Sequence, residues 1–392
     1  MTSKKLEETK ELLTRGVEEI IDRVNLERKL GEGRSLRVKL GIDPTSPNLH
    51  LGRSIPLLKL RDFQALGHQI IFIIGDFTGL IGDTSDKDSE RPMLSAETVK
   101  ENLQTYIKQA GKIIDIGQAE IRHNSEWLGK LNYLDIGRQA NGFSLNEFIS
   151  RDNIRRRLEA GKRISLRELL YPLMQGYDSV EVKADVEIGG TDQRFNLLTG
   201  RDVQKLYGQA PQDIITNPMI EGLDGRKMSS SFGNGINLMD EPNEMFGKIM
   251  SLADGLIIRY FTLLTRVAMA TVNEYEQSLK AEANPRDLKL KLAGEIVRMY
   301  HSAETAKEAE NYFIKTFSKK EIPDNLPEFK PSQYDLISVL VESKLASSKT
   351  EAGRLIEQGG VKINSGVITD PHYLVPSDAV LQKGKLKFLK VE

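Results

Sequence analysis

One strand–helix–strand segment constrains the fold of this chain more than any other feature. The predicted strand Gln69–Phe77 contains the uninterrupted apolar run Ile70–Ile74, which is typical of a strand buried on both faces. A shorter strand is predicted at Arg37–Ile42, and between the two lies a helical pattern at about His50–Leu66 that ends at Gly67. Strand, helix and strand in this order predict an α/β fold with a parallel sheet.

The chain of 392 residues is too long for one ordinary core, so we expect several domains. Strand patterns return at Asp185–Ile188 and Asp213–Thr216, after a long and mainly helical insertion at about 105–170. The predicted parts are a Rossmann-like α/β domain, a helical domain, a linker and a small α+β domain, in that order: residues 1–241, 242–317, 318–332 and 333–392.

Three local predictions complete this outline. Residues 1–30 have apolar side chains at helical spacing and are predicted to form one amphipathic helix. The stretch Gly79–Glu90, rich in Gly and Asp, is predicted to be a mobile loop. Near the C-terminus, two short helices and a Gly-Gly turn are predicted to precede the strand Val361–Ile363.

Composition narrows the classes of function. The formal net charge is -1, so nucleic-acid binding would need a local basic patch. The chain has no cysteine, which excludes disulfides, thiolate nucleophiles and cysteine-based zinc sites, and its five histidines are scattered, so we expect no protein-bound metal. The N-terminal stretch lacks the apolar core of a signal peptide, and no later stretch is long enough to span a bilayer, so we expect a cytoplasmic protein.

Two widespread nucleotide-binding patterns are absent from the sequence. There is no GxxxxGK[ST], which excludes a P-loop enzyme, and no GxGxxG after a strand, which argues against a dinucleotide cofactor. The junction between the loop Asp43–Asn48 and the next helix nonetheless suits phosphate, because main-chain N–H groups and the helix dipole favour anions there. His50 at this junction is able to donate to a phosphate oxygen, and Gly52 leaves room for adenine or ribose. Taken alone, His50 is explained more simply as a surface or capping histidine.

Six segments, in order along residues 41–234, resemble the tyrosyl-tRNA synthetase family, in particular its bacterial branch with LGIDP and KADVEIGGTDQ. They are GIDPTSPNLHLG at 41–52, GDFTGLIGDTSDKDSERP at 75–92, HNSEWLGKL at 123–131, YPLMQGYDS at 171–179, GGTDQRFN at 189–196 and DGRKMSSSFGN at 224–234. The first and last are similar to the two ATP-handling signatures of class I aminoacyl-tRNA synthetases. The resemblance implies that residues 1–241 are a catalytic domain, which forms tyrosyl-adenylate and pyrophosphate from tyrosine and ATP. The enzyme then loads tyrosine onto the 3′-terminal adenosine of tRNA(Tyr).

The resemblance assigns residues to the ATP side of such a site. The reaction needs no covalent enzyme intermediate, so catalysis must come from positioning and from cations and donors that bind the transition state. Asp192 matches an acceptor for the ribose hydroxyls, and Lys227 matches a cation that holds the departing pyrophosphate. The full expected catalytic set is His50, Arg53, Lys87, Arg91, Lys227 and Ser230. The expected ATP-binding set is Asp43, Thr45, Gly52, Gly190, Asp192, Met228 and Ser229. Without the resemblance, each Lys and Arg here is ordinary surface charge.

The resemblance also implies a tyrosine pocket. Tyr171, Gln175 and Asp178 fall on one helix face by their spacing of four and three residues. In the family this face lines the pocket and Asp178 accepts the phenolic O–H, so that phenylalanine would leave the acceptor unpaired. The expected tyrosine-binding residues are Asp83, Asn124, Tyr171, Gln175, Asp178 and Gln193. Without the family match, a helix with Tyr171 in the core and Asp178 in water is an equally good explanation.

Three residues depart from the family pattern. Arg53 stands where the first signature has its second histidine, and Ser230 replaces the second lysine of KMSKS. Lys39 stands where the better-known bacterial branch has a tyrosine that contacts the substrate hydroxyl. We expect activation to survive, because the pyrophosphate-side cations remain. The cation gained at Arg53 and the one missing at Ser230 indicate a redistribution of positive charge between the signatures.

Residues 334–368 resemble the small RNA-binding domain named after ribosomal protein S-four. The Lys and Arg residues of this module are clustered, which suits contacts with phosphates that set orientation. A solvated face of a helix and hairpin is the alternative explanation. The expected ligand is tRNA(Tyr), and the expected RNA-binding residues are Lys349, Arg354, Lys362, Lys385 and Lys387.

The family further implies a homodimer, and Mg²⁺ that accompanies ATP without a protein cage. Two alternatives stay open. A tryptophanyl-tRNA synthetase shares the fold, but it normally lacks the C-terminal module and the hydroxyl-reading Asp178. An inactive paralogue retained as an RNA-binding protein would account for Arg53 and Ser230, although retention of the other site residues argues against it.

Overall fold

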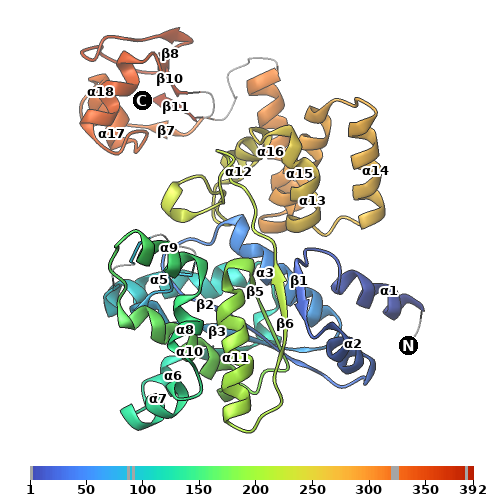
Figure 1. Cartoon of the computed structure of the whole chain (residues 1–392). Helices are drawn as coiled ribbons and strands as arrows, with labels where there is room; N and C mark the ends of the chain where they lie inside the picture. Colours follow the sequence, from blue (N-terminus) through green and yellow to red (C-terminus); the bar gives the residue numbers. More distant parts are fainter. Residues whose placement is uncertain (1–2, 86–88, 91–92, 319–325, 385–386) are drawn as a thin grey trace. The chain divides into compact units, whose positions relative to one another are not determined.

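The computed structural model describes residues 3–85, 89–90, 93–318, 326–384 and 387–392. The chain divides into two compact units, each with its own sheet (Figure 1). Unit 1 contains residues 1–240 and 248–302, and unit 2 contains residues 241–247 and 303–392. The domain boundaries at 241, 317 and 332 stay predictions beside this division.

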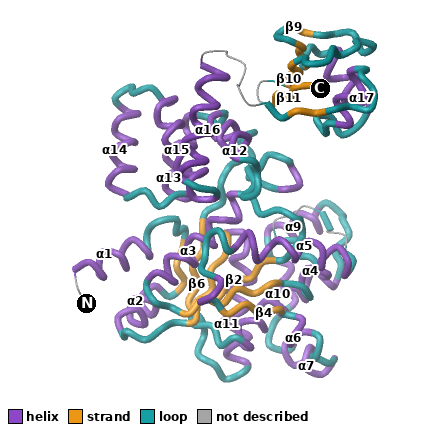
Figure 2. The backbone as a smooth tube through the Cα atoms, turned by 180° about the vertical axis from the view of Figure 1, so that it is seen from behind, coloured by secondary structure: helices purple, strands orange, loops and turns teal. Residues whose placement is uncertain are grey.

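Unit 1 is built on a six-stranded sheet in the order β1-β6-β5-β2-β3-β4. The neighbours β2 (Arg37–Ile42) and β3 (Gln69–Ile74) run parallel, as the strand–helix–strand pattern predicts. β5 (Val186–Gly190) and β6 (Asp213–Asn217) extend the parallel sheet on one side, and β4 (Glu120–His123) extends it on the other. Figure 2 shows these strands surrounded by helices. The predicted α/β fold with a parallel sheet is confirmed.

The helix that joins β2 to β3 is α3 (Leu51–Ala65). His50 is its N-cap residue, and Gly67 follows its end with a positive φ of 86°, which closes the helix. α3 begins directly after the loop that leaves β2, so the positive end of its dipole favours an anion there. Its first main-chain N–H groups already have acceptors: that of Leu51 donates to the carbonyl of Ile236 (2.8 Å) and that of Arg53 to the carbonyl of His50 (2.8 Å).

Two long helices, α10 (Leu166–Glu181) and α11 (Arg194–Leu206), pack tightly against each other. They meet at two glycines, Gly176 and Gly200. A Cβ on Gly176 would lie 2.9 Å from Val203 Cγ2 and 3.3 Å from the Cα of Gly200. The small residues let α10 lie close to α11, and this holds the predicted tyrosine-binding face of α10 in a fixed place.

The prediction of one helix over residues 1–30 is wrong. The segment forms α1 (Ser3–Leu12), the short strand β1 (Glu19–Ile21) and α2 (Arg23–Gly31). β1 pairs antiparallel with β6, at the edge of the sheet. The left-handed backbone at Gly16 (φ 61°) ends the helical path. The side chain of Arg15 donates to four carbonyls at and just beyond the end of a helix later in the chain. Tertiary pairing thus overrides the helical pattern.

Two further differences concern β4 and the chain that follows β3. β4 falls in a region where the sequence shows only helical patterns. Its residues EIRH are half-buried and mostly polar, so they do not form the apolar run that would predict a strand. The predicted strand Gln69–Phe77 ends at Ile74, and part of the predicted loop Gly79–Glu90 is the short helix α4 (Thr78–Ile81). Residues 86–88 of that loop lie outside the described residues.

Further helices complete unit 1. Those between β3 and α10 are α5 (Ala96–Ala110), α6 (Ser125–Leu128), α7 (Tyr133–Ala140), α8 (Leu145–Ile149) and α9 (Asp152–Glu159). The later ones are α12 (Pro242–Met250), which crosses the boundary between the units, α13 (Ile257–Leu264), α14 (Met269–Lys280) and α15 (Pro285–Tyr300). Single 3₁₀ turns are η1 (Ile116–Gln118), η2 (Thr191–Gln193), η3 (Ser230–Phe232) and η4 (Asp254–Leu256).

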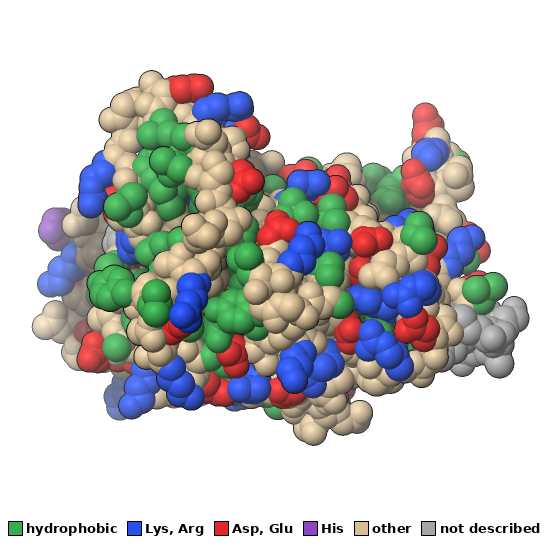
Figure 3. Space-filling view, turned by 60° about the horizontal axis from the view of Figure 1, so that its bottom comes forward, with side chains coloured by type: hydrophobic (Ala, Val, Ile, Leu, Met, Phe, Trp, Pro, Cys, Tyr) green, Lys and Arg blue, Asp and Glu red, His purple; other side chains and the backbone are tan. Residues whose placement is uncertain are grey.

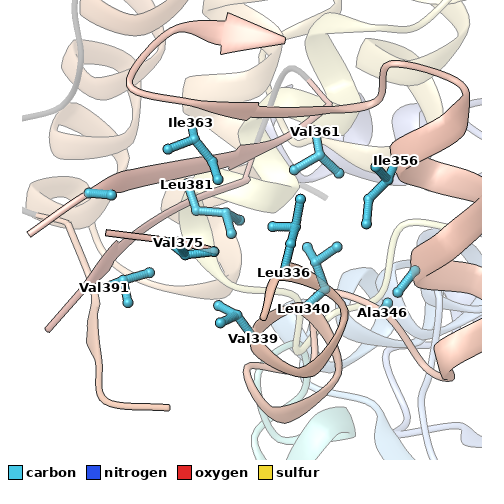
Figure 4. Packing of buried hydrophobic residues seen from close by; sticks show 12 residues of the cluster. Leu336, Val339, Leu340, Ala346, Ile356, Val361, Ile363, Val375, Leu381 and Val391 are labelled. Carbon is cyan, nitrogen blue, oxygen red and sulfur yellow. The ribbon is translucent and has the colours of Figure 1, made fainter. Parts of the chain in front are cut away.

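Unit 2 contains a small α+β fold, as predicted. Its sheet has the order β7-β11-β10-β8-β9, and α17 (Leu336–Glu342) and α18 (Lys349–Glu357) pack against it. Leu336, Ile356 and Leu381 are among the buried residues of this core (Figure 4). The strands are β7 (Glu328–Phe329), β8 (Val361–Ile363), β9 (Gly366–Val367), β10 (Val380–Lys383) and β11 (Lys387–Val391), and α16 (Ala303–Phe313) continues into the π-helical turn η5 (Ile314–Ser318).

Within the described ranges, no helix combines the length and the apolar character needed to cross a bilayer.

Candidate active site

The carboxyl ends of the parallel strands border a cavity of about 450 Å³ in unit 1. This is the edge at which open α/β sheets bind their ligands. Every described residue that the sequence predicts for catalysis, ATP binding or tyrosine binding lines this cavity: Asp43, Thr45, His50, Gly52, Arg53, Asp83, Asn124, Tyr171, Gln175, Asp178, Gly190, Asp192, Gln193, Lys227, Met228, Ser229 and Ser230. The remaining two, Lys87 and Arg91, lie outside the described residues.

His50 is buried at the start of α3. Burial, with added repulsion from Arg53 and Lys227, lowers the pKa of His50 to about 3, so its imidazole is neutral at pH 7. Its Nδ1 atom is buried without a hydrogen-bond partner among the described residues. A Cβ on Gly52 would lie 3.0 Å from that atom, so the glycine leaves the ring the space that it occupies. The structure presents a neutral imidazole beside two cations.

Arg53 is held by the loop that leaves β2. Its guanidinium donates to Thr45 Oγ1 (3.0 Å), to Tyr106 Oη (3.1 Å) and to the main-chain oxygen of Asp43 (3.4 Å). These three acceptors are neutral oxygens. They orient the guanidinium without cancelling its charge, which suits the binding of phosphate.

Asp43 links the same loop to α10. Its carboxylate accepts hydrogen bonds from Thr78 Oγ1 (2.7 Å) and from Tyr171 Oη (2.8 Å). Burial, together with the nearby carboxylates, raises the pKa of Tyr171 well above its usual range, so the phenol remains a donor. Glycine is required at position 75, because a Cβ there would lie 2.0 Å from Asp43 Oδ1.

Asp178 lies at the buried end of the cavity wall. Its Oδ1 atom accepts from Trp127 Nε1 (2.8 Å), and its Oδ2 atom accepts from Asn124 Nδ2 at 3.4 Å. Burial raises the pKa of Asp178 to about 7, while Lys39 and the two donors act in the opposite direction. Asp178 is therefore a buried acceptor whose charge changes near neutral pH, and not an exposed helix residue.

Asp83 and Gln193 form a second polar group on the wall. Gln193 Nε2 donates to Asp83 Oδ2 at 2.7 Å, and Ser85 Oγ donates to the same oxygen at 2.6 Å. The bonds tie the loop after α4 to the turn η2 that follows β5.

The segment KMSSS, residues 227–231, lines the cavity beside the start of α3. Lys227 Nζ lies 2.9 Å from Asp192 Oδ2, so a residue predicted for catalysis pairs with one predicted for ATP binding. The main-chain N–H of Gly52 donates to Met228 Sδ (3.2 Å). The hydroxyls of Ser230 and Ser46 lie 3.4 Å apart. These contacts place the segment directly on the loop and helix start that carry Arg53 and His50.

Several residues that shape the cavity were not singled out from the sequence. Trp127 donates to Asp178, and Thr78 donates to Asp43, as described above. Thr78 Oγ1 also accepts from Asn124 Nδ2 (2.8 Å). Asn234 fixes the KMSSS segment: its Oδ1 atom accepts from the main-chain N–H of Ser229 (2.9 Å), and its Nδ2 atom donates to the carbonyl of Lys227 (3.1 Å). Trp127 and Asn234 stand in the quoted segments HNSEWLGKL and DGRKMSSSFGN, and this was the only signal that the sequence offered for them.

The predicted RNA-binding residues lie in unit 2. Lys349 starts α18 and Arg354 lies in its last turn, and both are exposed. Lys387 is exposed at the start of β11, and Lys362 on β8 is partly exposed. Lys385 lies outside the described residues.

In the part of the chain that the structure describes, no group of three or more His, Asp or Glu residues is arranged to hold a metal ion.

Two family models match the chain. The model of tRNA synthetases class I (W and Y) matches residues 31–318, and the model of the S4 domain matches residues 336–381.

Similar proteins agree with these matches. The tyrosine–tRNA ligase of Thermotoga maritima is 47% identical over 390 residues, which cover 98% of this chain and 97% of that protein. The tyrosine–tRNA ligase of Carboxydothermus hydrogenoformans is 48% identical over 397 residues, which cover 97% of each. A solved structure, the tyrosyl-tRNA synthetase of Archaeoglobus fulgidus complexed with L-tyrosine, is 26% identical with a TM-score of 0.63 and covers 78% of this chain and 99% of that chain. Since the first model spans most of the chain and the relatives match it almost from end to end, the chain belongs to the tRNA synthetases class I (W and Y).

Proposed function

We propose that this chain is a tyrosine–tRNA ligase. It activates L-tyrosine with ATP, giving tyrosyl-adenylate and pyrophosphate, and transfers tyrosine to the 3′-terminal adenosine of tRNA(Tyr). One observation carries the proposal: both ATP-side segments and the Tyr171–Asp178 face of α10 line a single cavity. The similar proteins of Thermotoga maritima and Carboxydothermus hydrogenoformans are named for the same activity.

In the activation step, a carboxylate oxygen of tyrosine forms a bond to the α-phosphorus of ATP. The bond from that phosphorus to the bridging oxygen breaks, and pyrophosphate leaves with the electron pair. Negative charge on the phosphate oxygens is met by Arg53 and Lys227, and the sequence adds Lys87 and Arg91. Because the pKa of His50 is about 3, its ring acts as a neutral N–H donor to this charge and not as a cation.

The nucleotide side of the cavity changes partners when ATP binds. Asp192 accepts the ribose hydroxyls, with Gly190 allowing close approach, so the contact between Asp192 and Lys227 gives way. The ammonium of Lys227 then turns to the phosphates. In this proposal the ion pair keeps the side chains of Asp192 and Lys227 close to their binding positions before ATP arrives. Mg²⁺ enters bound to ATP as part of the substrate.

The amino-acid side selects tyrosine by its hydroxyl. The phenolic O–H donates to Asp178, while Tyr171 and Gln175 lie near the α-amino group. An apolar ring without the hydroxyl would leave the buried Asp178 unsatisfied on that side, which is costly. This asymmetry favours tyrosine over phenylalanine.

Unit 2 binds tRNA in this proposal, through Lys349, Arg354, Lys362, Lys385 and Lys387. The match to the S4 domain and the exposure of Lys349, Arg354 and Lys387 support this role.

Exposed apolar side chains support the proposal of a homodimer. Tyr133 and Leu134 on α7 are 93% and 63% exposed, and Leu145 and Leu166 are exposed nearby in the sequence. The space-filling view shows apolar side chains gathered between charged ones on the face that it presents (Figure 3). Exposed apolar side chains that gather on one face are typical of surfaces that a partner covers.

Charging of tRNA tests the proposal. The purified full chain, with MgATP, is expected to attach tyrosine to tRNA(Tyr) and to leave tryptophan unattached to tRNA(Trp). Charging of tRNA(Trp) with tryptophan would instead identify a tryptophanyl-tRNA synthetase. Binding of tRNA(Tyr) without charging would support a role in RNA binding alone.

A further inference from the structure

A buried ion pair lies behind the wall of the cavity and is not part of the site described above. Lys39 on β2 is 0% exposed, and Glu187 on β5 is 1% exposed. Lys39 Nζ lies 2.9 Å from Glu187 Oε1, and the two residues are directly opposite each other on the paired strands. Neither residue lines the cavity. A buried pair of this kind is costly unless further hydrogen bonds satisfy it.

Those further bonds lead to α10. Lys39 Nζ donates to Ser179 Oγ (2.6 Å) and to the carbonyl of Gln175 (3.1 Å). Glu187 Oε1 accepts from Gln175 Nε2 at 3.2 Å, and Glu187 Oε2 accepts from Ser179 Oγ at 3.2 Å. Both charged residues therefore grip the same two positions of the helix that carries the proposed tyrosine pocket.

A residue of the loop before β6, Gln212, also contacts Glu187. Gln212 Nε2 donates to Glu187 Oε2, and Gly200 on α11 leaves room for this contact. A Cβ on Gly200 would lie 2.7 Å from Gln212 Nε2 and 3.3 Å from Glu187 Oε2. The network thus joins β2, β5 and the loop before β6 to α10 across the interior.

We propose that Lys39 and Glu187 are a positioning pair for the selection of tyrosine: they hold Gln175 and the adjacent Asp178 in place from beneath without touching the substrate. The inference rests on the proposed tyrosine-binding role of this helix face. It also explains why a lysine stands at position 39, since its ammonium is committed to Glu187 and Ser179 and not to the substrate hydroxyl.

The pair also acts on Asp178 through its charge. Lys39 on β2 opposes the rise in the pKa of Asp178 that burial causes, and Glu187 on β5 adds to that rise. The groups that face Asp178 from the other elements, Trp127 on α6 and Asn124 before it, donate hydrogen bonds that favour its charged form.

Tyr171 on the same helix is a neutral phenol with a strongly raised pKa. Of the groups named, Lys39 is thus the cation that keeps Asp178 able to ionise near pH 7. An ionised Asp178 is the stronger acceptor for a phenolic O–H.

Two variants test the proposal. Lys39→Met removes the cation, and Lys39→Met combined with Glu187→Gln removes both charges, so that no unpaired charge remains if the single variant fails to fold. We expect the pH at which tyrosine kcat/KM rises to move upwards by roughly 1 pH unit in Lys39→Met. The shift should be smaller in the double variant, because Glu187 itself raises the pKa of Asp178 and is neutralised there. We expect the KM for tyrosine to rise roughly 5- to 30-fold with little change in the KM for ATP, and the preference for tyrosine over phenylalanine to fall.

A readout without catalysis accompanies these assays. Trp127 is the single tryptophan of the chain and donates to Asp178, so its emission reports the ionisation of that carboxyl. The emission midpoint of the wild-type protein is expected near pH 7 and that of the variants at higher pH.

Lys59→Met is the matched control. Lys59 is also buried, lies 3.6 Å from Asp62, and does not line the cavity. Its loss is expected to lower stability without moving the emission midpoint or the KM for tyrosine. Folded Lys39 variants with unchanged midpoint, KM and selectivity would overturn the inference. Absence of tyrosine-dependent activity in the wild-type protein would instead refute the proposed function, and the emission midpoints would still test the electrostatic link.

Discussion

Asp178 is the side chain on which the choice of amino acid rests in this account. It is 4% exposed and has protein donors on both carboxylate oxygens, which fix its orientation toward the cavity. Replacement by asparagine keeps the shape but removes the charged acceptor. We expect Asp178→Asn to lower kcat/KM for tyrosine roughly 10- to 100-fold, the range for hydrogen bonds to charged groups. Phenylalanine should be affected far less.

Pyrophosphate exchange measured with both amino acids checks this prediction. An equal loss for tyrosine and phenylalanine would show that Asp178 supports the pocket without reading the hydroxyl.

His50 links the site to stability at low pH. Its pKa is about 3 in the folded protein, against about 6.5 in an unfolded chain, so only the unfolded state takes up a proton between these values. The contribution of the neutral His50 ring to the free energy of unfolding is complete above pH 6.5 and is lost as the pH falls toward 3. When the pH falls from 7.5 to 4.5, the free energy of unfolding of the wild-type protein should decrease by roughly 3 kcal/mol more than that of a His50→Gln variant.

Urea unfolding at the two pH values measures this difference. Parallel losses in the two proteins would mean that His50 becomes protonated within the folded state.

Arg53 and Ser230 are the two departures from the family signatures, and the structure connects them through one loop. Arg53 donates to Thr45 Oγ1, and the hydroxyl of the next residue, Ser46, lies 3.4 Å from that of Ser230. We therefore expect Arg53→His and Ser230→Lys to be coupled. In adenylate formation, the double variant should differ from the product of the single effects by roughly 2-fold or more, since groups that share a contact network are rarely additive. Strictly independent effects would argue against a redistribution of charge.

Among the elements, the close packing of α10 on α11 is the contact that most directly fixes the proposed tyrosine-binding face of α10. A methyl group at position 176 would lie 2.9 Å from Val203 Cγ2 and 3.4 Å from the main-chain nitrogen of Gly200. We expect Gly176→Ala to destabilise unit 1 by roughly 1–3 kcal/mol, as overpacking does, and to raise the KM for tyrosine.

Gly294→Ala is the control for this change. Gly294 lies inside α15 with open space around a Cβ, so alanine there should be neutral or stabilising by up to about 1 kcal/mol. Guanidinium unfolding of both variants gives the comparison, and equal stabilities would contradict the packing argument.

The elements differ in how far their sequence determines them. β2, α3 and β3 were predictable, because an apolar run with a cap at each end of the intervening helix leaves few alternatives. β1 and β4 were not. β1 owes its form to pairing with β6 after the turn at Gly16, and β4 has half-buried residues without an apolar run. Both strands depend on partners that are distant in the sequence.

The site divides in the same way. Its members could be named from six matched segments, and all those described line one cavity. Their partners could not. Nothing in the sequence indicates that Lys227 pairs with Asp192 or that Lys39 pairs with Glu187, because both ion pairs join residues more than 30 positions apart. Only the packing of the strands and loops creates these contacts.

At the scale of the whole molecule, the account assigns chemistry to unit 1 and RNA binding to unit 2. We expect the triple variant Lys349→Ala, Arg354→Ala and Lys387→Ala to bind tRNA(Tyr) more weakly. The slope of log affinity against log salt should fall by roughly 2, because each phosphate that a cation neutralises contributes about 0.7–0.9 to that slope. Tyrosine activation without tRNA should not change.

Lys390→Ala provides the control for tRNA binding. Lys390 is paired with Glu328 (3.2 Å) and Asp378 (3.4 Å) and is not one of the predicted contacts. Its removal should leave the salt slope as it is. A triple variant with the wild-type slope would place the RNA contacts elsewhere.

Exchange of pyrophosphate into ATP, measured with the purified full chain and each of tyrosine, phenylalanine and tryptophan, is the decisive assay for tyrosine activation. It requires only the cavity of unit 1 and its two substrates. We expect rapid exchange with tyrosine and far slower exchange with the other two, because neither side chain supplies the phenolic donor to the buried Asp178. Exchange that does not depend on tyrosine, or that is as fast with phenylalanine, would contradict this expectation.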